Sequence, residues 1–164
     1  MEKVIIIGCP GSGKSIFGRK LRAITGLPLF HLDMMYWNQD GTTVPKEVFL
    51  VRLQDVMNNS KWIIDGNYAG SMEMRLNECD TVFFLDYPTK VCMAGIEARK
   101  GKVRSDMPWT ETDNTDEEFI AFINSFNSES RPGIIDLLKK YSSKNIVVFH
   151  SREESEEYLT NIPD

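Results

Sequence analysis

A glycine-rich segment near the amino terminus carries the strongest chemical signal in the sequence. Residues 8–15 match the pattern G-x-x-x-x-G-K-[ST] at every fixed position. Glycines in such a loop let the backbone turn tightly and direct its N–H groups at phosphate oxygens. Lys14 of this pattern reaches the β- and γ-phosphates of a nucleotide, and the hydroxyl of Ser15 ligates Mg²⁺. A turn that binds nothing is the alternative. The residues predicted to bind the nucleotide are Gly8, Pro10, Gly11, Ser12, Gly13, Lys14 and Ser15.

Three aspartates stand where predicted strands end, namely Asp33, Asp65 and Asp86. In an open parallel sheet, ligands bind at the carboxyl ends of the strands. Phosphoryl transfer uses one carboxylate to hold Mg²⁺ and can use another to orient or deprotonate the acceptor hydroxyl. We expect Asp65 on the metal side and Asp33 on the acceptor side, with turn or cap roles as the alternatives. Asp86 is better explained as a strand end that caps the next helix, and His31 as a packed strand residue.

Four cations lie within six residues of an acidic protein: Arg99, Lys100, Lys102 and Arg104. Arginines on a closing lid can stabilise the charge of the transferred phosphoryl group, and the lid excludes water. We therefore expect Arg99 and Arg104 to be catalytic, together with Arg131 from the far side of the lid. A solvated basic helix end is the alternative interpretation.

Candidates for the acceptor site follow the first two aspartates. Tyr36 and Trp37 could stack on an acceptor ring, although aromatic side chains beside a strand also suit a core. Asn67 follows Asp65 by two residues, and we assign it to the substrate side. Arg75 could reach an acceptor phosphate or carboxylate, with a surface salt bridge as its alternative.

The elements that must position these residues alternate along the chain. Short apolar runs predict strands over 3–7, 29–32, 62–65, 81–86 and 145–150. Apolar spacing and capping signals predict helices over 14–25, 46–59, 71–79, 89–100, about 116–126, 131–141 and after Ser151. The stretch 33–45 looks irregular. This alternation indicates an α/β fold with a parallel sheet and helices on both faces.

Length and composition limit the class of protein. The 164 residues predict a single domain, with 33–60 as an acceptor-side segment and 99–131 as a lid segment. Three separated cysteines and two histidines indicate neither a disulfide framework nor a zinc site, so a reducing cytoplasm is expected. A net charge of −5 makes nucleic acid an improbable partner, and no apolar run is long enough for a membrane helix or a signal peptide.

Several stretches resemble the adenylate-kinase-like P-loop kinases, and more narrowly the bacterial DNA topology modulation proteins, or putative adenylate kinases. The stretches that carry the resemblance are 8–15, 31–37, 62–68, 72–76, 84–88, 101–107 and 131–132. The resemblance implies a three-layer P-loop NTPase fold with strand order 2-3-1-4-5 and a short helical lid. It also implies that Arg99 lies near the adenine, with Arg152 on its other side. The Phe-Pro-Arg-Thr stretch of adenylate kinases and the triple glycine of shikimate kinases are absent.

These observations favour an ATP-dependent small-molecule kinase with a nucleoside monophosphate as the leading acceptor. Regulatory GTPases carry Asn-Lys-x-Asp, which does not occur here. Two alternatives remain open. One is a nucleotide-dependent regulatory or DNA-associated protein with little turnover, and the other is a simple nucleotide hydrolase. The sequence does not predict an oligomeric state.

Overall fold

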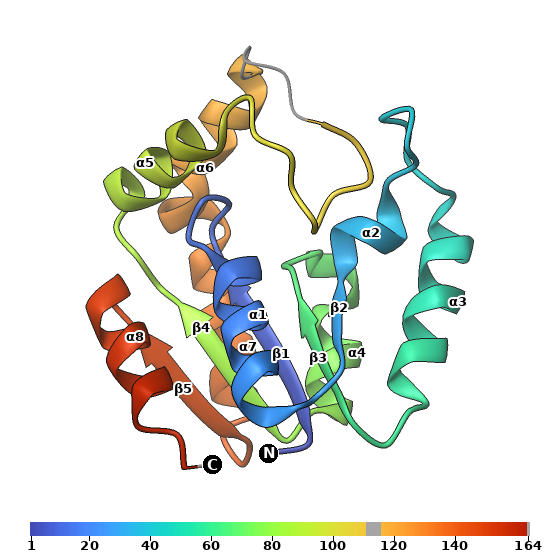
Figure 1. Ribbon diagram of the computed structural model, residues 1–164, viewed down its shortest axis with the longest axis vertical. Helices are drawn as coiled ribbons and strands as arrows, with labels where there is room; N and C mark the ends of the chain where they lie inside the picture. The colour runs from blue at the N-terminus through green and yellow to red at the C-terminus, as the bar shows by residue number, and fades with distance from the viewer. Residues whose placement is uncertain (111–115, 164) are drawn as a thin grey trace.

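Five short strands form one fully parallel sheet at the centre of the molecule (Figure 1). We describe a computed structural model over residues 1–110 and 116–163. The strands are β1 (Lys3–Gly8), β2 (Leu29–His31), β3 (Trp62–Asp65), β4 (Thr81–Leu85) and β5 (Asn145–Phe149). Their order, β2-β3-β1-β4-β5, confirms the predicted sheet.

The central strands are continuous apolar runs because helices cover both faces of the sheet. Residues 4–7 of β1 are fully buried, as are residues 82–84 of β4. A parallel sheet needs such two-sided cover, and this is why its strands do not alternate between apolar and polar residues. The buried strands supply a rigid frame, and the site lies at its carboxyl edge.

Helices connect the strands and form the two outer layers. In Figure 1, α1 and α8 lie in front of the sheet, whereas α4 and α7 lie behind it. The helices are α1 (Lys14–Thr25), α2 (Leu32–Tyr36), α3 (Lys46–Met57), α4 (Ala69–Glu78), α5 (Thr89–Arg99), α6 (Glu117–Glu129), α7 (Arg131–Lys140) and α8 (Arg152–Thr160). Among the described residues, no helix combines the length and apolar character needed to cross a membrane.

The predicted irregular stretch 33–45 is wrong in its first part, because α2 follows β2 without a loop. Leu32 and Met35, three residues apart on α2, are buried and hold this single turn of helix against the core. After it, Trp37 pairs with Thr43 across a turn that contains Gly41 at φ 82°. The short helix directs Asp33 and Tyr36 toward the carboxyl edge of the sheet.

Within the predicted lid segment, 99–131, the main described parts are a loop and a helix. Residues 102–110 contain no helix or strand, and α6 follows from Glu117. Residues 111–115 belong to the predicted lid but lie outside the described residues. Figure 1 shows the stretch before them descending between α5 and α2 toward the loop that precedes α1.

Candidate active site

The glycine-rich loop connects β1 to α1 and packs closely on α5. Gly11 has φ 81°, and a Cβ there would lie 2.0 Å from the carbonyl oxygen of Cys92. A Cβ on Gly95 would lie 2.0 Å from the carbonyl oxygen of Gly11. Only glycine permits this approach of two backbones. One side of the loop therefore packs on α5, and its other side lines a cleft.

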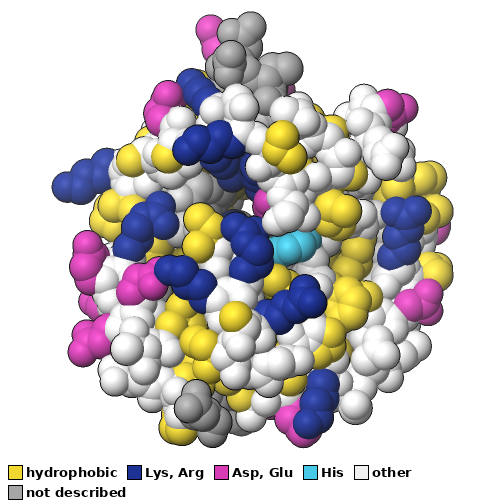
Figure 2. Space-filling model, in the orientation of Figure 1, with side chains coloured by type: hydrophobic (Ala, Val, Ile, Leu, Met, Phe, Trp, Pro, Cys, Tyr) yellow, Lys and Arg dark blue, Asp and Glu magenta, His cyan; other side chains and the backbone are white. Residues whose placement is uncertain are grey.

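A broad cleft extends from this loop to α2 and the lid segment. It is lined by loop residues such as Lys14 and Ser15, by Asp33 and Asp65, and by the predicted lid cations Arg99 and Arg104. Figure 2 shows a hollow near the centre of this face, with lysine and arginine side chains gathered around it. The structure thus brings the phosphate loop, two of the strand-end aspartates and the basic cluster to one place.

Lys14 folds back onto its own loop. Its Nζ donates to the carbonyl oxygens of Gly8 and Cys9 at 2.9 and 3.3 Å. Burial lowers the pKa of Lys14, while the charges of Asp65 and Asp33 act in the opposite direction. A bound nucleotide phosphate would add negative charge beside this buried ammonium and so would favour its protonated form.

Asp33 faces the cleft beside an aromatic hydroxyl. The Tyr68 hydroxyl donates to Oδ1 of Asp33 at 2.5 Å. Burial raises the pKa of Asp33, although this hydrogen bond lowers it in part, and burial also raises the pKa of Tyr68. Tyr68 is the one described non-glycine residue with positive φ, at 37°. Strain of this kind is concentrated at functional sites, and sequence analysis assigned Tyr68 no role.

Asp65, at the end of β3, is 4% exposed and pairs with His31 from β2. Nδ1 of His31 lies 2.7 Å from Oδ2 of Asp65. Burial lowers the pKa of His31, but the hydrogen bond and charge of Asp65 outweigh it, so the pKa is raised. His31 is therefore more than a packed strand residue, because it orients a carboxylate of the cleft.

Asn67 ties this region to the phosphate loop. Its Oδ1 accepts from the Gly8 N–H at 2.9 Å, and its Nδ2 donates to the Gly8 carbonyl at 2.6 Å. The side-chain amide thus satisfies both backbone groups where β1 enters the loop. Asn67 also lines the cleft, so its predicted substrate role remains a prediction beside this observed structural one.

Arg75 and Arg131 lie away from the cleft. Arg75 is fully buried, and its guanidinium donates to the carbonyls of Gly66 and Ser71 at 2.8 and 3.3 Å and also to that of Asn67. It therefore holds the β3–α4 connection instead of facing an acceptor. Arg131 makes two hydrogen bonds of 2.7 Å to Asp86. This ion pair fixes the start of α7 to the end of β4.

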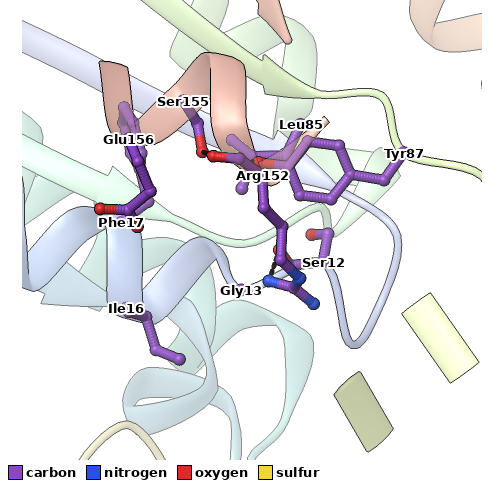
Figure 3. A pocket seen from close by; sticks show the side chains of 9 residues that line it. All are labelled: Ser12, Gly13, Ile16, Phe17, Leu85, Tyr87, Arg152, Ser155 and Glu156. Carbon is purple, nitrogen blue, oxygen red and sulfur yellow. Dashed lines mark hydrogen bonds between the residues drawn. The ribbon is translucent and has the colours of Figure 1, made fainter. Parts of the chain in front are cut away.

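Arg152 meets the phosphate loop from α8 (Figure 3). Its Nη1 and Nη2 donate to the carbonyls of Ser12 and Gly11, each at 3.0 Å. The guanidinium carbon also lies 5.6 Å from the ring centre of Tyr87. Arg152 therefore stabilises the loop conformation with a positive charge, and its predicted contact with an adenine stays a prediction.

Aromatic side chains from four parts of the chain meet at the α2 end of the cleft. The ring of Tyr36 lies 4.9 Å from that of Tyr68 and 5.4 Å from that of Trp37, between ring centres. Trp37 in turn meets Trp109 of the lid segment edge to face at 5.7 Å. Together with Phe49 we call these residues the aromatic cluster. Four of its members line the cleft together with Asp33, namely Tyr36, Trp37, Tyr68 and Trp109.

The loop 102–110 of the predicted lid segment contributes a carboxylate that sequence analysis did not single out. Oδ2 of Asp106 accepts a hydrogen bond from the Ser15 hydroxyl at 2.8 Å. Arg104 forms an ion pair with the same carboxylate. The motif 101–107 marked this stretch, but nothing in its spacing places Asp106 at the phosphate loop.

The oxygen atoms of the cleft fit Mg²⁺. Carboxylates and hydroxyls are the ligands this ion prefers, and it commonly takes only one or two carboxylates together with phosphates and water. Within residues 1–110 and 116–163, no three acidic, histidine or cysteine side chains are grouped closely enough to cage a metal. Ser15 and Asp65 are thus suited to a metal that arrives with a nucleotide.

Comparisons with known proteins support the fold. No family model matches the chain, and no curated protein matches it. Among solved structures, it is similar to shikimate kinase from Acinetobacter baumannii in complex with shikimate. The TM-score is 0.62 at 14% identity, and the match covers 98% of this chain and 92% of that one. The α/β fold with sheet order 2-3-1-4-5 is therefore the P-loop fold of that kinase. The narrower resemblance to the topology modulation proteins stays a prediction.

Proposed function

We propose that this protein is an ATP-dependent kinase that phosphorylates a small acceptor. The observation that carries the proposal is the shared cleft, in which Lys14 of the phosphate loop and the Asp33 carboxylate both face the same space. Phosphoryl transfer needs little covalent chemistry from a protein, because positioning and charge stabilisation supply most of the catalysis. The solved kinase with this fold is consistent with the proposal.

The donor half of the reaction follows from the loop. Its backbone N–H groups and the amino terminus of α1 would hold the phosphates, and Lys14 would neutralise their charge. Ser15 and Asp65 would hold Mg²⁺, which would supply stabilisation of the negative charge that develops on the transferred group. Arg99 and Arg104 line the same cleft from the lid, and in this proposal they stabilise the transferred group.

The acceptor half centres on Asp33. Its raised pKa and its contact with Tyr68 suit a group that receives a proton from an acceptor hydroxyl. The aromatic cluster would stack on a ring beside it. A nucleoside monophosphate has the required ring, and Arg19, which also lines the cleft, is a cation that could meet its phosphate.

A second acceptor class is favoured by the burial of Arg75. The cation predicted to bind an acceptor phosphate is fully buried and donates to backbone carbonyls. A neutral hydroxylated ring compound, such as a nucleoside, would need only Asp33 and the aromatic cluster. Both classes are kinase substrates, so the reaction proposed is the same.

An acceptor panel tests the proposal. ADP release from Mg·ATP is measured with no acceptor, with nucleoside monophosphates, with nucleosides and with shikimate. We expect one class to raise ADP release well above the basal rate. Strong ATP loss that no acceptor changes would instead identify a hydrolase, and nucleotide binding without turnover would favour the regulatory alternative.

A further inference from the structure

The contact between Asp106 and Ser15 joins the lid to the phosphate loop. Asp106 lies in a turn of the loop 102–110, ninety-one residues from Ser15 in the sequence, yet the carboxylate oxygen and the hydroxyl oxygen are 2.8 Å apart. Asp106 is 3% exposed, so its carboxylate is shielded from water. The hydroxyl it meets is the one that the loop motif assigns to Mg²⁺.

The carboxylate at this position lies between Arg104 and Ser15. Its Oδ1 accepts from Nε of Arg104 at 3.1 Å, and its Oδ2 accepts from Arg104 and from the Ser15 hydroxyl. Burying a charge is costly unless other charges compensate it. Arg104 supplies one compensating charge in this structure.

A nucleotide would change this balance. Phosphates on the loop would bring negative charge close to Asp106, and two like charges repel strongly where water is excluded. A divalent cation between them would reverse the sign of the interaction. A carboxylate at this position would therefore favour a nucleotide that carries Mg²⁺ over one that does not.

We infer that Asp106 is a metal-side residue of the lid, which binds the Mg²⁺ of the bound nucleotide directly or through a water molecule and so makes lid closure depend on the metal. This inference rests on the proposed nucleotide site. Asp106 is a positioning residue in this account, because it acts on the phosphates through the metal. Arg104 then remains next to the same carboxylate and orients it.

The experiment compares ADP binding with and without Mg²⁺ by titration calorimetry. ADP is used so that no turnover occurs, and EDTA removes the metal in the second arm. The variants are Asp106→Asn, which keeps the shape and removes the charge, and Asp106→Glu, which keeps the charge. Asp136→Asn on α7 is the matched control, because Asp136 is exposed and far along the chain from the loop. Thermal unfolding of each variant checks that it is folded.

The quantity that decides the inference is the factor by which Mg²⁺ strengthens ADP binding. We expect that factor to fall about tenfold in Asp106→Asn, as for other residues that support a metal from outside its first ligands. Asp106→Glu should recover part of it, and Asp136→Asn should match the unaltered protein. If Asp106→Asn does not fold, Asp106→Ser, which also removes the charge, takes its place in the comparison, and an unchanged factor there would overturn the inference.

Other outcomes also overturn it. If Asp106→Asn keeps the full Mg²⁺ factor, the inference is wrong while the proposed nucleotide site stands. If the variant binds ADP more tightly by the same factor with and without metal, Asp106 merely competes with phosphate for Ser15. If the unaltered protein binds no ADP in either arm, the proposed function fails together with the inference.

Discussion

Charges held close together away from water define the cleft at the scale of single residues. Lys14 lies near Asp33 and Asp65, and Asp106 lies near Arg104. Because such charges interact strongly when partly buried, removing one of them affects both stability and ligand binding. The predictions for single side chains follow from this balance.

Replacing Lys14 with alanine should abolish nucleotide-dependent activity. The side chain is the positive group closest to the predicted β- and γ-phosphates, and loss of one such charge-stabilising donor costs on the order of 100-fold or more in rate. Acceptor-dependent ADP release measures the effect. Lys20→Ala is the matched control, since Lys20 is an exposed residue of the same helix that pairs with Glu156. Unchanged turnover in Lys14→Ala would show that the loop assignment is wrong.

His31 should make the stability of the ligand-free protein depend on pH. Its pKa is raised above the ordinary value of 6.5 by Asp65, so its contribution is complete below pH 6.5 and is lost as the pH rises through the raised value. His31→Gln should therefore lower the free energy of unfolding most below pH 6.5. The decrease should become smaller as the pH rises through the raised pKa of His31. Urea denaturation in EDTA at a series of pH values measures it.

A matched histidine variant separates the pH-dependent contribution of His31 from the general cost of replacing a histidine. His150 has a side chain that is 66% exposed and lies 3.7 Å from Asp86, so His150→Gln should cost less stability than His31→Gln. A loss in His31→Gln that is the same at every pH would contradict the charged pair with Asp65.

At the scale of elements, the close approach of α5 to the phosphate loop should be intolerant of any side chain. In Gly95→Ala, the new Cβ would lie 2.0 Å from the carbonyl oxygen of Gly11, so the loop or the helix must move. We expect ADP binding to weaken at least about tenfold. Gly133→Ala in α7 is the control, because nothing lies within 4 Å of its Cβ position. There, an alanine should leave binding unchanged and stabilise the helix by about 0.5–1 kcal/mol. Equal binding in both variants would contradict the close contact.

Arg75 should act on stability and not on acceptor binding. Its guanidinium satisfies buried carbonyls of the β3–α4 connection, and leaving such acceptors unsatisfied costs about 1–3 kcal/mol. Arg75→Met should lower the free energy of unfolding by that amount in urea denaturation, whereas exposed Arg22→Met on α1 should not. A variant of full stability with a raised acceptor KM would restore the predicted substrate role.

The elements also show which parts of the site can be predicted from sequence. The loop motif places seven residues at once because their spacing is local, and the strand ends place Asp33 and Asp65 because a parallel sheet gathers them at one edge. Arg75 and Arg131 could not be placed this way. Their spacing is compatible with the cleft, but whether an arginine faces solvent, a ligand or a buried carbonyl depends on packing. Asp106 was missed because it belongs to a loop without periodicity.

At the scale of the whole molecule, alternation of strands and helices was sufficient to predict a parallel α/β fold, since only that architecture covers both faces of continuous apolar strands. The order of the strands was not available from spacing and came from the family resemblance, and the sheet confirms it.

Net charge was also an incomplete guide to the surface of the cleft. The chain carries −5 overall, yet the cleft gathers lysine and arginine side chains around its phosphate loop (Figure 2).

The fate of the γ-phosphoryl group tests the central claim most directly. ATP labelled with ³²P at the γ-position is incubated with the protein, Mg²⁺ and each acceptor, and the label is then divided between organic product and inorganic phosphate. Our account predicts that the label moves mainly into one acceptor, and that Asp33→Asn lowers this transfer about 100-fold or more while ADP binding is retained. Label that appears only as inorganic phosphate with every acceptor, or that stays in ATP, would contradict it.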